Sequence, residues 1–469
     1  MDDHRMKPLR IGFLPIVRIQ FDIALAEEMI KSAREHLQAT GFELVEPEQP
    51  ISDLQAAQVA VLTLSMVPVD LVLIYQATFA DSSMVVAIAE AVDAPVFLWG
   101  VPEAWTGERL RLNSLCGINL AGHALTLRKF QYDYAYTMPQ DPEVIEKIQN
   151  LALAGSLRRR LKTARLGVVG EHPVGMDTCH LDEPRLSEMF GVQIQHIELD
   201  DVFTRARSIS ESTIAQTRTL LNTHLDNLPT LDQVRLSGTL SVYNALKEIT
   251  SEQKLDGLAV RCWPEFFTQM GCAACGAMSM LSDGFGQATP VPCSCEADIN
   301  GTLTQLILQW LSGNPAFGTD IVGIDDDKNR VALWHCGLAP LSMADPNTPP
   351  QGGIHSNRQV PLVMDFPLRP GMITIARLSQ ATGSLRLILG KGEMLAESKP
   401  FSGTAGVVKL ACPAQEFLDL MMREGLEHHI SLTYGDYYAT LRSFAEIIKL
   451  PVLTIGEEEY PIRNQIQNG

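Results

Sequence analysis

The stretch Asp70-Leu71-Val72-Leu73-Ile74-Tyr75 is almost entirely apolar. A run of this length and composition is typical of a strand buried on both faces of a parallel sheet. Similar runs stand at Arg10–Ile16 and at residues 94–99, and helical spacing of apolar residues over 23–37 and 84–92 separates the three. Strands that alternate with helices in this way predict βαβ units and a parallel sheet.

The same alternation restarts after a polar helix that ends in Arg158-Arg159-Arg160. Residues 163–170, 192–199 and 255–260 are predicted strands, and 231–249 is a predicted long helix. We therefore expect two Rossmann-like α/β domains, over residues 1–160 and 161–312.

Composition changes from Asn314 onward, where short alternating segments lie between breaks rich in proline and glycine. Such segments favour an antiparallel sheet or a small barrel. The last third, residues 313–469, is predicted to be a β-rich, barrel-like domain with one terminal helix over residues 437–449.

The chain has 469 residues and a formal net charge of −18, with 37 basic against 55 acidic residues. Nucleic-acid binding needs a concentrated positive face, so this balance argues against it. No apolar run approaches the length of a membrane span, and the first residues lack a signal-peptide core. We expect a cytoplasmic protein with no membrane partner, whose nine cysteines are reduced.

Candidate chemistry gathers where predicted strands end, as it does in open α/β sheets. The strand over 255–260 runs directly into Arg261-Cys262-Trp263-Pro264-Glu265, and Glu296 and Asp298 stand before a predicted helix. Asp298 also fits a simple helix N-cap. Two carboxylates from separate strand ends, together with one imidazole, suit Mn²⁺ or Mg²⁺ better than structural zinc.

Three histidines are candidates for that imidazole: His335, His428 and His429. Adjacent residues of a strand point to opposite faces, so at most one of the pair His428-His429 is expected to reach the site.

A competing interpretation is a zinc knuckle made by Cys272, Cys275, Cys293 and Cys295. The residues around Cys272 and Cys275 are small and apolar, which favours the start of a buried helix in which free cysteines pack as small apolar groups.

Taken in order, the motifs resemble the L-fucose/L-arabinose isomerase superfamily over essentially the whole chain. The strongest are Trp263-Pro264-Glu265, Glu296-Ala297-Asp298 and the C-terminal His428-His429 followed by Gly435-Asp436. Weaker similarities follow the first and third strands, at Leu14-Pro15-Ile16-Val17-Arg18 and Gln76-Ala77-Thr78-Phe79-Ala80-Asp81.

The resemblance implies a ketol isomerase of carbohydrate metabolism that binds Mn²⁺, with Mg²⁺ or Co²⁺ as substitutes, and acts on a free sugar through a cis-enediol. It implies Glu265 and Asp298 as catalytic residues. The implied metal ligands are Glu265, Asp298 or Glu296, and His429 or His428. The implied substrate-binding residues are Arg18, Gln76, Thr78, Trp263, Arg261 and His335, with His335 assisting ring opening.

Relatives in this superfamily act on L-fucose, D-arabinose, L-arabinose or sulfoquinovose, a sulfonated glucose, and the shorter chain favours a divergent member. An anionic sugar would need a guanidinium group, which Arg18, Arg261 or Arg109 offers. The resemblance also implies a closed homo-oligomer, a trimer, tetramer or hexamer, in which a neighbour's N-terminal domain completes each site. The alternatives are a metal-dependent lyase or epimerase on the same scaffold, and a non-catalytic sugar-binding protein.

Overall fold

The structure, a computed structural model, describes residues 8–287 and 289–456. The chain forms two compact units. The first comprises Met1–Arg160 and Ala439–Lys449, and the second comprises Leu161–Tyr438 and Leu450–Gly469. The three-domain division expected from the sequence stays a prediction.

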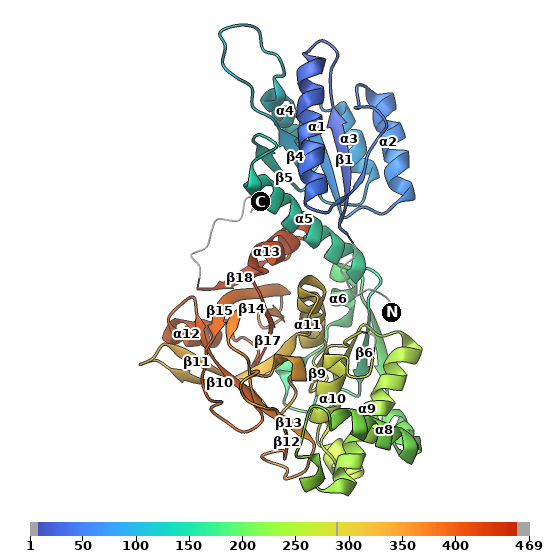
Figure 1. The fold of residues 1–469 in the computed structure, drawn as a ribbon, viewed down its shortest axis with the longest axis vertical. Helices are drawn as coiled ribbons and strands as arrows, with labels where there is room; N and C mark the ends of the chain where they lie inside the picture. The colour runs from blue at the N-terminus through green and yellow to red at the C-terminus, as the bar shows by residue number, and fades with distance from the viewer. Residues whose placement is uncertain (1–7, 288, 457–469) are drawn as a thin grey trace. The chain divides into compact units, whose positions relative to one another are not determined.

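The first unit is built on a parallel sheet with strand order β2-β1-β3-β4-β5, seen in the upper part of Figure 1. Its strands are β1 (Arg10–Ile16), β2 (Glu43–Val45), β3 (Leu71–Gln76), β4 (Val96–Gly100) and β5 (Tyr132–Tyr136). The predicted central strand is confirmed, since every residue of β3 is buried.

Helices cover both faces of this sheet, which is why its inner strands β1, β3 and β4 are almost entirely buried and apolar. They are α1 (Ile23–Ala39), α2 (Leu54–Met66), α3 (Ser83–Ala91), α4 (Ser114–Leu127) and α5 (Pro142–Leu161). Asp22 caps α1 by accepting the Leu25 N–H. Gly155 of α5 lies so close to the sheet that a Cβ there would sit 1.9 Å from the Asp70 carbonyl oxygen.

Part of the C-terminal helix α13 (Tyr438–Ile447) belongs to the first unit. Ile447 packs against one face of the core of that unit. The Thr440 hydroxyl donates a hydrogen bond of 2.7 Å to the side-chain oxygen of Asn150.

The second unit contains a parallel sheet with strand order β7-β6-β8-β9. The strands are β6 (Arg165–Val169), β7 (Gln193–Ile197), β8 (Gly257–Val260) and β9 (Cys293–Cys295). The connecting helices are α6 (Glu183–Phe190), α7 (Leu199–Ser208), α8 (Glu211–Leu221), α9 (Gln233–Gln253), α10 (Ala274–Asp283) and α11 (Ile299–Ser312).

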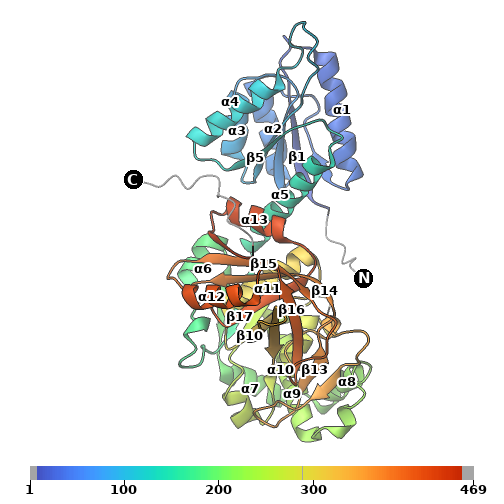
Figure 2. The ribbon, with the colours of Figure 1, turned by 90° about the vertical axis from the view of Figure 1, so that its left-hand side faces the viewer.

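A β-barrel completes the second unit, and Figure 2 shows its strands beside α11. The order β16-β11-β10-β17-β14-β15 closes because β15 also pairs with β16. The strands are β10 (Phe317–Asp325), β11 (Arg330–His335), β14 (Gly371–Ser379), β15 (Arg386–Met394), β16 (Thr404–Leu410) and β17 (His429–Tyr434), extended by β12 (Gln351–Gly353), β13 (Val363–Pro367) and β18 (Val452–Ile455). The predicted fold class, two parallel α/β sheets followed by a barrel-like part, is confirmed.

Sheet and barrel of the second unit share one apolar core, which joins Val260 and Cys295 to Ile375 and Leu432. After Asn314, where one terminal helix was expected, the chain forms a further helix, α12 (Ala414–Glu424), which buries only Ala414 and Phe417. In the part of the chain that the structure describes, no helix is long and apolar enough to cross a membrane.

Candidate active site

The ends of neighbouring strands position the candidate site. β8 and β9 pair in parallel, so the segments that follow Val260 and Cys295 emerge at the same edge of the sheet. Glu296 and Ala297 turn with φ of 58° and 57°, and Asp298 then begins α11 by accepting the Gly301 N–H at 2.8 Å. The N-cap predicted for Asp298 is confirmed.

The barrel brings two histidines and a further acid to this turn. Residue Asp320 of β10 pairs with His429 of β17 in the antiparallel register, and His428 directly precedes β17. The Glu296 Oε2 atom lies 3.3 Å from His428 Nε2 and 3.9 Å from His429 Nε2. Asp320 Oδ1 lies 3.4 Å from His429 Nε2 and 3.9 Å from His428 Nε2.

Both imidazoles therefore reach the same carboxylate, with ring centroids 4.0 Å apart. The expectation that only one of the two histidines would do so is wrong. Because β17 begins at His429, His428 lies outside the strand and does not follow its alternation.

Asp298 orients the imidazole of His429 by contacting its Nδ1 atom. Its Oδ2 atom lies 2.9 Å from His429 Nδ1 and also accepts a hydrogen bond from Arg377 Nη1. The side chains of Asp298 and Arg377 are only 1% and 3% exposed. This contact leaves Nε2 of His429 to face Glu296 and Asp320.

These contacts set the protonation of the site. Burial alone would raise the pKa of Asp298, but Arg377 and His429 outweigh it and hold the pKa well below its ordinary value. Burial likewise opposes the lowered pKa of Glu296, which hydrogen bonding to His428 and the neighbouring His429 produce. Both groups are carboxylates at neutral pH.

Further side chains hold this cluster in place. The Trp263 indole N–H donates to Glu296 Oε1 at 3.1 Å, so the predicted Trp263 joins the site. Thr178 Oγ1 lies 2.9 Å from His428 Nδ1, and the Cys179 thiol lies 3.7 Å from Glu296 Oε2. The sequence pointed to neither Thr178 nor Cys179, which lie in a short 3-10 helix (Asp177–Cys179) after β6 and belong to no recognisable motif.

The other predicted acid, Glu265, has a different partner. Its carboxylate forms a two-pronged pair with Arg261, at 2.7 and 3.0 Å, directly after β8. Glu265 belongs to none of the groups of described residues whose ligand atoms converge within 4.8 Å. Its place on the ion stays a prediction.

His335 is buried between two thiols. Its Nε2 lies 2.9 Å from Cys295 Sγ, and its Nδ1 lies 3.2 Å from Cys336 Sγ and accepts the Cys336 backbone N–H. Burial lowers the pKa of His335 to about 4, so the ring is neutral. Its role in ring opening stays a prediction.

Arg18, Gln76 and Thr78 lie together in the first unit, at the ends of β1 and β3. The Thr78 hydroxyl accepts the Arg18 backbone N–H at 2.8 Å, and the Arg18 guanidinium pairs with Asp81. The Gln76 side chain is fully buried, and neither of its amide atoms has a hydrogen-bond partner within residues 8–287 and 289–456.

The donor atoms around His429 suit a divalent metal ion. Ligand atoms of Glu296, His428 and His429 lie within 4.8 Å of one another, as do those of Cys179, Asp298 and His429. Asp320 Oδ1 is buried and, among the described residues, accepts no hydrogen bond, although it faces both Nε2 atoms. Carboxylate oxygens with imidazole nitrogens fit Mn²⁺, Co²⁺ or Zn²⁺, so the residues present fit an ion of this class.

The four cysteines of the possible zinc knuckle do not form one group. No set of described residues whose ligand atoms converge contains more than one of them: Cys275 lies with Cys336 and His355, and Cys295 lies with His335 and His429. The expectation that Cys275 lies in a buried helix start is confirmed, since it is 2% exposed in the first turn of α10.

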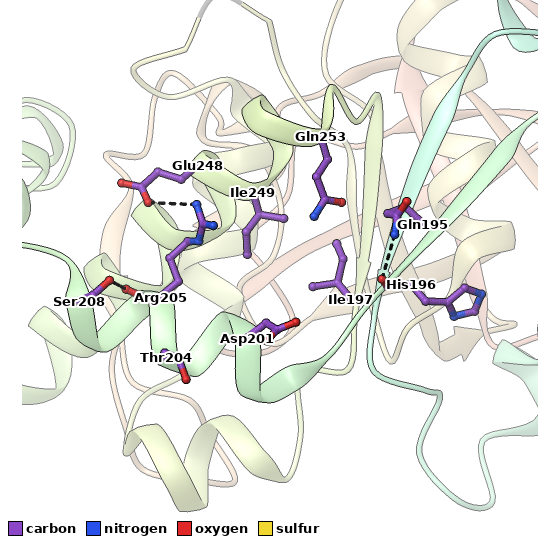
Figure 3. Close-up of a pocket in the computed structure, with 10 residues that line it drawn as sticks. All are labelled: Gln195, His196, Ile197, Asp201, Thr204, Arg205, Ser208, Glu248, Ile249 and Gln253. Atoms are coloured by element: carbon purple, nitrogen blue, oxygen red, sulfur yellow. Dashed lines mark hydrogen bonds and ion pairs between the residues drawn. The ribbon is translucent and has the colours of Figure 1, made fainter.

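A surface hollow of about 700 Å³ lies elsewhere on the second unit, against β7, α7 and α9 (Figure 3). It is lined by Gln195, His196, Ile197, Asp201, Thr204, Arg205, Ser208, Glu248, Ile249 and Gln253. None of the residues predicted for the site lines it, and Arg205 there is already paired with Glu248 and Glu252.

Acids at the edge of a parallel sheet, faced by histidines from a barrel, form the candidate site. Family models match this chain at both ends: "Fucose/sulfoquinovose isomerase, N-terminal domain" over residues 12–162 and "L-fucose isomerase, C-terminal domain" over residues 364–456. The chain belongs to this fucose isomerase family and is an aldose–ketose isomerase.

Relatives support this assignment along the whole chain. Sulfoquinovose isomerase of Priestia aryabhattai is 32% identical over 447 residues, which cover 95% of this chain and 99% of the relative. The sulfoquinovose isomerase of Alkalicoccus urumqiensis is 31% identical over 454 residues, with the same coverage. Among solved structures, GanP, a glucose-galactose binding protein from Geobacillus stearothermophilus, aligns with 14% identity over 66% of this chain and 93% of its own, with a TM-score of 0.17.

Proposed function

We propose that this protein is a metal-dependent isomerase that interconverts sulfoquinovose and its ketose through a cis-enediol. The observation that carries the metal dependence is the convergence of Glu296, Asp320, His428 and His429 beside a carboxylate–histidine contact. The observation that carries the substrate is the similarity to sulfoquinovose isomerases over 95% of the chain.

In this proposal Glu296, Asp320, His428 and His429 hold Mn²⁺, with Mg²⁺ or Co²⁺ as substitutes. When bound, such an ion supplies Lewis-acid polarisation of neighbouring sugar oxygens. Asp298 acts as a positioning residue, because its carboxylate on Nδ1 keeps Nε2 of His429 directed at the ligand set. A carboxylate whose pKa is held far below neutrality is a weak base, which favours this role over proton abstraction.

Proton transfer between the two sugar carbons then falls to Glu265. Its side chain is 21% exposed, so solvent and substrate reach it, whereas Asp298 is 1% exposed. Arg261 holds the Glu265 carboxylate in one orientation through two contacts. The carboxylate removes the proton from the carbon next to the carbonyl and returns it to the former carbonyl carbon, while the proton of the neighbouring hydroxyl passes to the former carbonyl oxygen.

The sulfonate of the substrate needs a cationic partner. Arg18 is suited to this role although it pairs with Asp81, since both side chains of that pair are well exposed, at 38% and 45%, and an exposed ion pair is weak enough to be exchanged for a sulfonate. In this proposal the protein is a closed homo-oligomer, and the first unit of one chain completes the site of a neighbouring chain. Arg18 then reaches the neighbour's substrate, with Gln76 and Thr78 beside Arg18.

The test follows isomerisation by NMR with sulfoquinovose, L-fucose and L-arabinose in parallel, before and after chelation. We expect turnover of sulfoquinovose that chelation abolishes and Mn²⁺ restores. Undiminished activity in the chelated protein would refute the metal dependence. Preference for a neutral sugar would refute the substrate and leave the metal-dependent isomerase intact.

A further inference from the structure

A second group of metal-binding side chains lies outside the candidate ligand set. Cys275 comes from the first turn of α10, Cys336 directly follows β11, and His355 lies in the loop between β12 and β13. The two Sγ atoms are 3.1 Å apart, and one ligand atom from each of the three residues lies within 4.8 Å of the others.

The surroundings hold the imidazole toward the thiols. The His355 backbone N–H donates to Val360 at 2.9 Å, and the Phe267 ring packs edge-on against the imidazole at 5.2 Å. His355 Nδ1 is buried and has no hydrogen-bond partner in the described part of the chain. One ring nitrogen of His355 lies within 4.8 Å of both sulfurs, and the imidazole has a buried nitrogen without a partner among the described residues, so it has a coordination position to offer.

The charge of the deprotonated group balances that of a divalent ion. The lining is apolar, with Ala273, Val360 and Val363 packed around Cys275. The adjacent Cys275 thiol and burial raise the pKa of Cys336, and burial together with Arg358 lowers the pKa of His355. Without a cation the group is therefore neutral. Two thiolates and a neutral imidazole around a divalent ion are also neutral in sum, so the occupied group buries no net charge.

We propose that Cys275, Cys336 and His355 form a second metal site, selective for a thiophilic divalent ion of the Zn²⁺ type. Thiolate and imidazole ligands favour zinc, whereas the oxygen-rich group at Glu296 favours harder ions. Zinc–sulfur bonds of about 2.3 Å at a tetrahedral angle place two sulfurs about 3.8 Å apart, so small side-chain rotations admit the ion. Three protein ligands leave its fourth position to water.

The proposed zinc site would be linked to the candidate active site through His335. Cys336 is bonded to His335 in sequence, and its Sγ and backbone N–H both contact His335 Nδ1, at 3.2 and 2.9 Å. The opposite ring nitrogen contacts Cys295, whose sulfur lies 3.6 Å from His429 Nε2. An ion bound to Cys336 would thus hold His335 and Cys295 in position, and Cys295 is the neighbour that contacts His429.

The test measures metal content and thiolate coordination in the full-length protein, purified under reducing conditions. We expect about one zinc per chain by elemental analysis, and a cadmium–thiolate charge-transfer band when Cd²⁺ replaces zinc. Cys336→Ser and His355→Gln should bind Zn²⁺ and Cd²⁺ about 100-fold more weakly, because each removes one of three protein ligands. Cys272→Ser is the matched control, a buried cysteine of the same C-x-x-C segment that lies outside the group.

Three results would overturn the proposal: full zinc affinity in folded Cys336→Ser, equal loss in Cys272→Ser, or no zinc bound by the folded, reduced wild type. An intact mass two units below the reduced value, with the link mapped by peptide digestion to Cys275 and Cys336, would identify a disulfide there and would also overturn the proposal. Because Mn²⁺ binding and turnover are read separately, failure of this proposal and failure of the proposed isomerase mechanism remain distinguishable.

Discussion

Replacing Asp298 with asparagine separates a positioning role from a ligand role. The two carboxylate oxygens have three partners: Oδ1 accepts the Gly301 N–H, and Oδ2 contacts His429 and Arg377. An asparagine has a single acceptor oxygen, so it keeps either the helix cap or the orientation of His429. The change removes one charge while nearly preserving the shape of the side chain.

The expected magnitude follows from the geometry. Loss of the carboxylate behind a histidine ligand typically weakens metal binding by about 10- to 100-fold, or about 1.4–2.7 kcal/mol. Asp298→Asn should therefore shift the Mn²⁺ concentration for half-maximal activity upward by that factor, and saturating Mn²⁺ should restore most of the turnover number. The assay is the initial rate of sugar isomerisation across a Mn²⁺ titration.

Glu296→Gln is the comparison variant, because it removes a predicted ligand rather than its support. Its activity should stay lost at every Mn²⁺ concentration. A folded Asp298→Asn protein that stays inactive at saturating Mn²⁺ would show that Asp298 contacts the ion or the substrate itself. The positioning role would then be wrong, and the ligand role predicted from the sequence would stand.

Three further predictions concern stability and assembly. Asp298→Asn should also lower the free energy of unfolding by about 3–5 kcal/mol, because Arg377 is left buried without its partner. Adding Arg377→Met should recover part of that loss in urea unfolding, and purely additive losses would contradict the pairing. Gly155→Ala should destabilise the first unit by more than about 3 kcal/mol in thermal unfolding, since its Cβ would meet a backbone oxygen at 1.9 Å; an unchanged melting temperature would refute this. Mixing inactive Arg18→Ala and Glu265→Ala chains should restore some activity if neighbouring chains share sites, whereas no recovery after confirmed subunit exchange would place Arg18 elsewhere.

The sequence predicted the parts of the molecule that local patterns determine. Buried parallel strands such as β3 are apolar on both faces, and residues that follow them gather at one edge of the sheet. That rule points to Glu296 and Asp298 from the sequence alone, because the segment that holds them follows the end of a strand.

Asp320 and Arg377 were missed for a physical reason. Both lie on barrel strands, where a polar residue in an alternating pattern is usually assigned to the solvated face. Only the closure of the barrel and its register place Asp320 opposite His429 and bring Arg377 to Asp298. Such long-range pairing leaves no periodic signal in one sequence.

Both groups of ligands need a divalent ion to balance their negative charge, but their ligand atoms favour different ions. Around His429, three carboxylates, Glu296, Asp298 and Asp320, face one guanidinium, so two negative formal charges remain when the imidazoles are neutral. A divalent ion balances them, and hard oxygen ligands favour manganese. Around Cys275 the same balance requires two thiolates, which favour zinc. The His335 ring touches Cys336 with one nitrogen and Cys295 with the other, so each group constrains the ring that separates them.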